Sequence, residues 1–127
     1  MKKVVVLAAH ATSSAAARRL VDEVLTGAPA DVRTTVQLLT SELVTNVIHH
    51  THSEVRVSVD AGSPVRVEVH DGHAATDAFR EMFGAKRSVD PDATSGRGLS
   101  LVHDLASRVG LDDDPDGGKV VWFEIDI

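Results

Sequence analysis

Cysteine is absent from this sequence, and its absence excludes several kinds of chemistry at once. Disulfide bonds, thiol nucleophiles and cysteine-rich zinc sites all require it. Aromatic residues make up only 3% of the chain, so no row of rings is available to stack on nucleic-acid bases. Long apolar runs are missing too, because no stretch approaches the roughly 20 residues of a membrane-spanning helix.

Positive charge is also scarce. Lysine and arginine total 13 against 19 aspartates and glutamates, which gives a formal net charge of −6. Because non-specific binding to nucleic acid depends on basic patches, we expect no direct nucleic-acid contact, and we expect no membrane attachment. The first residues carry two lysines and a short apolar run, but His10 interrupts the run before it reaches the length of an export signal. A cytoplasmic location is therefore expected.

The remaining composition is that of an ordinary globular domain. The chain has 127 residues, of which 43% are hydrophobic and 25% are charged, which is enough for one modest core. No internal repeat or linker interrupts it. We therefore expect a single domain over residues 1–127.

Hydrophobic periodicity predicts an alternation of strands and helices along the chain. Period-two patterns predict strands over residues 2–8, 54–60, 65–70 and 120–127. Patterns with a period near 3.6 predict helices over 13–26, 31–50 and 99–109, with a short helix over 77–83 inside a long loop, 73–95. The sum predicts an α+β fold, a two-layer sandwich with helices on one face of a mixed, mostly antiparallel sheet.

Two polar residues one turn apart on the helix over 31–50 are candidates for phosphate chemistry. Glu42 and Asn46 form an i, i+4, i+8 row with His50, and this row borders the apolar stripe of the helix. An asparagine carbonyl suits magnesium, and a carboxylate one turn earlier could accept a proton from water or a hydroxyl. Taken alone, such a pair is more often a solvated part of a helix surface.

Two further short motifs follow. Asp71-Gly72 stands where a strand is expected to end, and a buried carboxylate there could accept a hydrogen bond from the amino group of adenine. The segment Ser95-Gly96-Arg97-Gly98-Leu99 opens a helix, where free N–H groups and small residues suit a phosphate. Each alone also fits an ordinary turn or loop end. Neither a P-loop nor the dinucleotide-binding glycine fingerprint is present.

Taken in order, these three motifs resemble those of the GHKL ATPase superfamily, which includes DNA gyrase, histidine kinases and the MutL repair proteins. Residues 41–50 are similar to the N-box, residues 69–72 to the adenine-binding G1 box and residues 96–102 to the G2 box. The resemblance covers nearly the whole chain. It is closest to the stand-alone anti-sigma-factor serine kinases of Gram-positive bacteria, especially those of actinobacterial type, and it implies the Bergerat ATP-binding fold.

The resemblance also implies cofactors, partners and roles for single residues. ATP or ADP with Mg2+ would be the cofactors, and a sigma factor and a STAS-type anti-anti-sigma protein would be the partners of a homodimeric kinase that regulates transcription. The roles implied are magnesium ligation by Asn46, general-base catalysis by Glu42 on a partner's serine, adenine recognition by Asp71 and Gly72, phosphate binding by Gly96, Arg97, Gly98 and Leu99, a phosphate-side contact by His50, and partner binding by Arg18.

The sequence also departs from the family pattern. His73 stands where the G1 box usually has a second glycine, and its side chain would crowd the adenine pocket. Thr94 and Ser95 offer no positive charge just before Gly96, with Arg97 and Lys86 as the available substitutes. A catalytically silent interaction module with weak or no nucleotide binding is therefore an open alternative. A metal-binding or hydrolase domain is another, because the chain has seven histidines.

Overall fold

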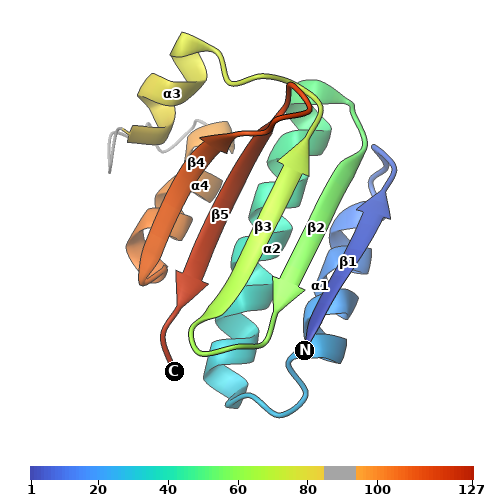
Figure 1. Cartoon of the computed structure of the whole chain (residues 1–127), viewed down its shortest axis with the longest axis vertical. Coiled ribbons are helices and arrows are strands. Elements are labelled where there is room, and N and C mark those ends of the chain that lie inside the picture. The colour runs from blue at the N-terminus through green and yellow to red at the C-terminus, as the bar shows by residue number, and fades with distance from the viewer. Residues whose placement is uncertain (85–93) are drawn as a thin grey trace.

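The computed structural model describes residues 1–84 and 94–127, with side chains left out for residues 94–98. The described parts of the chain form one five-stranded sheet and four helices (Figure 1). In chain order these are β1 (Lys2–Leu7), α1 (Ser13–Val24), α2 (Ala30–Thr51), β2 (Val55–Asp60), β3 (Val65–Asp71), α3 (Asp77–Gly84), α4 (Thr94–Leu105), β4 (Arg108–Asp113) and β5 (Lys119–Ile125).

The sheet has the strand order β1-β2-β3-β5-β4. Helices α1, α2 and α4 lie behind one of its faces in Figure 1, and α3 sits at the end of the sheet where β3 ends. The predicted α+β two-layer architecture is confirmed. One detail is corrected, because every strand pair in the described residues is antiparallel, so the sheet is not mixed.

The helix predicted over 99–109 is confirmed for residues 99–105, but both of its ends lie earlier in the chain. It begins at Thr94 and ends at Leu105, so Gly96 and Gly98 lie inside its first turns and not in a loop before it. The last two residues of the predicted helix, Arg108 and Val109, instead begin strand β4, in which Val109 pairs with Phe123 of β5. Val109 fits either element by local spacing, and pairing with a strand distant in sequence decides between them.

The core lies between the helices and the inner face of the sheet. Alternate residues of β2 and β3 point inward, and six valines there are at most 2% exposed: Val55, Val57, Val59, Val65, Val67 and Val69. The predicted stripes of α1 and α2 pack against them, since Ala17, Leu20, Val21, Val24, Val36, Leu39, Leu43 and Val47 are all buried. Full burial of one such side chain contributes about 1.5–3 kcal/mol.

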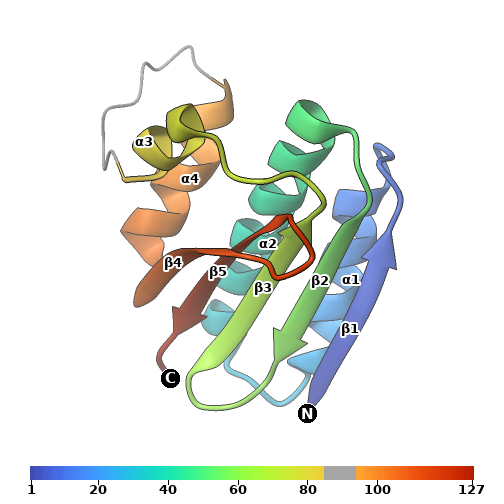
Figure 2. The ribbon, with the colours of Figure 1, turned by 45° about the horizontal axis from the view of Figure 1, so that its top comes forward.

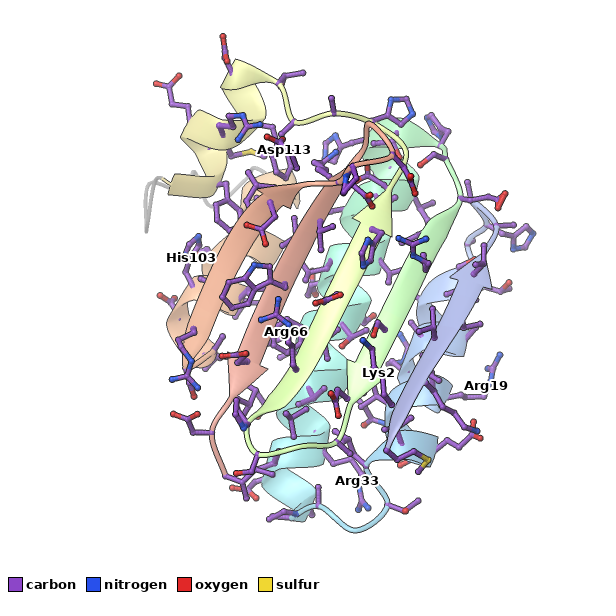
Figure 3. All side chains as sticks on the ribbon, viewed as in Figure 1. Lys2, Arg19, Arg33, Arg66, His103 and Asp113 are labelled. Carbon is purple, nitrogen blue, oxygen red and sulfur yellow. The ribbon has the colours of Figure 1, made fainter. Side chains whose placement is uncertain are left out.

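The outer face of the sheet carries a chain of ion pairs centred on Arg66, which Figure 3 labels, while Val4 and Val6 of β1 are exposed on it. Arg66 contacts Glu68 at 2.9 Å and Glu124 at 3.1 Å, and Arg108 contacts Glu124 at 2.7 Å and also bonds Asp126. Hydrogen bonds from Arg108 lower the pKa of Glu124 and of Asp126. Burial alone would raise the pKa of Glu68, but hydrogen bonds from Arg66 and His70 outweigh it and lower that pKa.

This network predicts a loss of stability in acid. A carboxylate whose pKa is lowered by folding stabilises the native state above its unfolded pKa, and this contribution disappears as pH falls through the folded pKa. We expect the urea midpoint to hold steady down to about pH 4.5, the ordinary glutamate value, and to fall below it. Glu124→Gln should make this fall in the urea midpoint shallower. Glu23→Gln is the control and should leave the fall unchanged, because Glu23 of α1 pairs with Lys3 of β1 in an exposed ion pair. If the urea midpoint fell equally steeply with pH in the wild type and in Glu124→Gln, the stabilising role of the ionised Glu124 would be contradicted.

Within the described residues, no helix combines the length and the apolar character that crossing a membrane requires.

Candidate functional site

Four of the residues singled out by the sequence, Asn46, His50, Asp71 and Leu99, meet at the end of the sheet where β3 ends and β5 begins. A cavity there is lined by α2, β3, α3, α4 and β5, and Figure 2 shows α3 beside α4 at this end. Its walls are mostly apolar: Leu43, Val47, Val69, Phe79, Met82, Leu99 and Val121. Its polar lining residues are Asn46, His50, Thr51, Asp71 and Lys119.

Helix α2 supplies two of the predicted site residues. Asn46 and His50 are one turn apart and both line the cavity, while Glu42 lies one further turn back and does not line it. Among the described residues no hydrogen bond to the Asn46 amide is present, and an amide carbonyl oxygen is a suitable ligand for a hard cation. Helical spacing places the Glu42 carboxylate on the same side of α2.

Arg18 lies outside the cavity. Its Nη1 donates to the Ser41 Oγ at 2.9 Å, across the seam between α1 and α2. Ser41 directly precedes Glu42 in sequence. Arg18 therefore lies against α2 and is partly held by it. This position suits a role at the surface and does not place Arg18 in a ligand-binding site.

Asp71 is paired inside the protein. Its side chain is 3% exposed and that of Lys119 is 7% exposed, and the Lys119 Nζ lies 2.9 Å from Oδ2 and 3.1 Å from Oδ1 of Asp71. The two residues face each other in the register between β3 and β5, on the helix side of the sheet. The carboxylate expected to read adenine thus already contacts an ammonium group.

The turn after Asp71 completes this arrangement. The His73 N–H donates to Asp71 Oδ1 at 2.8 Å, and the His73 carbonyl accepts from Lys119 Nζ at 3.3 Å. The His73 side chain is exposed; it does not line this cavity, but it does line a larger hollow that adjoins it. Gly118 fits here only without a side chain, since a Cβ would lie 1.9 Å from the Asp71 carbonyl oxygen.

Helix α3 closes one side of the cavity with few contacts. Thr76 Oγ1 accepts the Phe79 N–H at 3.0 Å at its start, and the Phe79 ring lies 4.9 Å from Lys119 Nζ. At its end, His103 of α4 bonds the Phe83 carbonyl oxygen at 2.6 Å. No residue of α3 is fully buried. Segments with so little buried apolar surface are the ones that open most readily.

The cavity is chemically suited to a flat heterocycle but is small. Small-molecule sites are usually lined by apolar side chains with a few polar groups among them, as this cavity is. Its volume is about 50 Å³, whereas ligand pockets usually hold about 300 Å³ or more. A second hollow of about 420 Å³ adjoins it and shares Phe79, Met82 and Lys119 as wall residues. Displacement of these side chains would join the two spaces.

The phosphate-loop residues are placed in part. Leu99 is 4% exposed and lines the cavity from α4. Gly96, Arg97 and Gly98 belong to the first turns of the same helix; the Arg97 side chain and the whole of Lys86 lie outside the described residues. Most of the second half of the predicted loop, residues 85–93, lies outside them as well.

Sequence reasoning missed part of this site. Five residues that line the cavity stand outside the predicted motifs: Thr51, Phe79, Met82, Lys119 and Val121. A lysine at the start of a strand is ordinarily a solvated residue, so no local signal identified it. The metal-centre alternative finds no support, because the described residues contain no group of three or more His, Asp or Glu able to hold a metal ion.

Comparison with solved structures identifies proteins with a similar fold. A chain in the crystal structure of the SiaB–SiaC complex from Pseudomonas aeruginosa is 14% identical, with a TM-score of 0.66 over 98% of this chain and 89% of that chain. The catalytic domain of histidine kinase ThkA is 18% identical, with a TM-score of 0.56 over 98% and 95%. No curated protein matches.

The family is established by sequence. The model of the histidine kinase-like ATPase domain matches residues 7–125, and the chain belongs to this family. Membership of an ATPase family implies nucleotide binding.

Proposed function

We propose that this protein is an ATP-binding serine kinase of the anti-sigma-factor type, which binds a sigma factor and phosphorylates a STAS-type anti-anti-sigma protein. The observation that carries the proposal is the convergence of Asn46, His50, Asp71 and Leu99 on one cavity from α2, β3 and α4. These are the positions that the resemblance assigned to magnesium, phosphate and adenine. They come together in a chain that belongs to an ATPase family.

Each residue has a role that its chemistry suits. Asp71 would accept the amino group of adenine, and the apolar walls would contact the faces of the ring. Asn46 would hold Mg2+, which supplies charge neutralisation on the phosphates when bound. Glu42, one turn away, would accept the proton of a serine hydroxyl on the partner. The first turns of α4, from Gly96 to Leu99, would present backbone N–H groups to phosphate.

Protein partners are part of the proposal. The structural relative from Pseudomonas aeruginosa was solved as a complex of two proteins, which supports a partner-binding role for this fold. Arg18, on the seam between α1 and α2, is the residue proposed to engage the partner. Homodimerisation and a cytoplasmic location complete the proposal.

Calorimetric titration with Mg-ATP tests the nucleotide site. We expect binding by the wild type and a loss of at least about tenfold in affinity in Asn46→Ala, because the variant removes the proposed magnesium ligand. Gln37→Ala is the matched control, since it removes an amide from the same helix away from the cavity. Folded wild-type protein that binds no nucleotide would overturn the proposal.

Phosphoryl transfer is tested with Glu42→Ala in the same series. Incubation with labelled ATP and a cognate STAS-type protein should give phosphoserine with the wild type. The variant should keep nucleotide affinity and lose transfer by about 10²–10⁴-fold, the usual contribution of a general base. Unchanged transfer in Glu42→Ala would contradict the role of this residue.

A second candidate function is favoured by two observations. Lys119 already occupies Asp71, and the cavity is small, so a catalytically silent interaction module with weak nucleotide binding also fits. This candidate predicts no ATP turnover in the presence of any partner. ATP turnover that disappears in Glu42→Ala would exclude it.

A further inference from the structure

The ammonium group of Lys119 is held by groups of the protein itself. It donates hydrogen bonds to Asp71 Oδ1 and to the carbonyl oxygen of His73, and it forms an ion pair with Asp71 Oδ2 at 2.9 Å. The Asp71 carboxylate also accepts the His73 N–H. The charge of the Asp71 carboxylate is therefore balanced within the protein before any ligand binds.

Burial makes this pair costly to disturb. Both side chains are more than nine-tenths buried, and separating two buried charges leaves each of them poorly solvated. A base that donates its amino group to Asp71 must therefore compete with an ammonium held at 2.9 Å. The competitor is part of the chain and is always present at the site.

Lys119 is also tied to the wall that keeps the cavity small. Its Nζ lies 4.9 Å from the centre of the Phe79 ring, on α3, which is within the range of a cation–π contact. Phe79 and Lys119 both line the cavity and the larger hollow beside it. Withdrawal of the ammonium from Asp71 would thus remove one of the contacts that hold α3 over the site.

We propose that Lys119 is a specificity-determining residue that competes internally for the base-reading carboxylate of Asp71 and thereby weakens adenine-nucleotide binding and recognition of the 6-amino group. This inference rests on the proposed nucleotide site. It goes beyond that proposal because it names a residue outside the family motifs, Lys119, as the one that limits the affinity of the site for adenine nucleotides. The ligands concerned are adenine nucleotides. A shorter, uncharged side chain at position 119 would leave the Asp71 carboxylate free to accept the amino group of the base.

The test compares two nucleotides on two proteins by calorimetry with Mg2+ present. ATP carries the 6-amino group, and purine riboside 5′-triphosphate lacks it. In the wild type we expect the two to differ by less than about threefold. In Lys119→Thr we expect ATP to bind at least about tenfold more tightly than in the wild type, and the preference for ATP over the purine analogue to exceed tenfold. Lys2→Thr, at an exposed lysine of β1, is the control and should change neither value.

The outcomes separate this inference from the proposed function. ATP binding that requires Asn46 but is no tighter in Lys119→Thr overturns the role of Lys119 and leaves the function standing. Absence of binding in both folded proteins overturns both. If Lys119→Thr does not fold, the wild-type measurements alone test the inference. A preference of about tenfold or more for ATP over the purine analogue would overturn it, because Asp71 would then be reading the 6-amino group despite Lys119.

Discussion

Asp71→Leu is expected to lower the free energy of unfolding by about 3–5 kcal/mol, because it leaves the buried Lys119 ammonium without its counter-charge. The two side chains are 3% and 7% exposed, so water cannot replace the lost carboxylate without local opening. For a domain with a typical total stability of about 5–15 kcal/mol, this is a large fraction. Urea unfolding at neutral pH measures it.

Two controls identify the cause. The double variant Asp71→Leu/Lys119→Met should recover most of the loss, since replacing both members of a buried pair with apolar groups of similar volume is often neutral. Glu23→Leu breaks the exposed pair with Lys3 and should cost only about 0–1 kcal/mol. A double variant as unstable as Asp71→Leu would show that the loss comes from packing and not from an unpaired charge.

Phe123→Ala is the second change with a large expected effect, about 3–5 kcal/mol of unfolding free energy. Phe123 is 0% exposed and stands between Val67 of β3 and Val109 of β4 in the sheet register. Truncation removes a large apolar group and leaves a cavity that its β-branched neighbours fill poorly.

Ile127→Ala is the matched control for this prediction. Ile127 is 61% exposed at the end of the chain, so its truncation should change stability by no more than about 0.5 kcal/mol. A loss below about 1.5 kcal/mol in Phe123→Ala would mean that the inner face repacks around the missing ring.

The local spacing of apolar residues was sufficient to predict most of the strands and helices. The strict alternation of valines in β2 and β3 predicted two strands with one buried face, and the apolar stripes of α1 and α2 predicted the helical layer that covers it. The row of Asn46 and His50 could be placed on one side of α2 for the same reason, because helical periodicity is a local property. These features depend on residues close to one another in the chain.

Pairing between distant segments decided the rest. Val109 could belong to a helix or a strand by its neighbours, and the ladder with β5 made it a strand. Lys119 meets Asp71 only because β3 and β5, joined by nearly fifty residues of chain, pair in one particular register. The sequence by itself determined the fold class and most of the candidate ligand-binding residues. Tertiary structure alone determined which charge lies against the Asp71 carboxylate, because strand register depends on packing of the whole inner face.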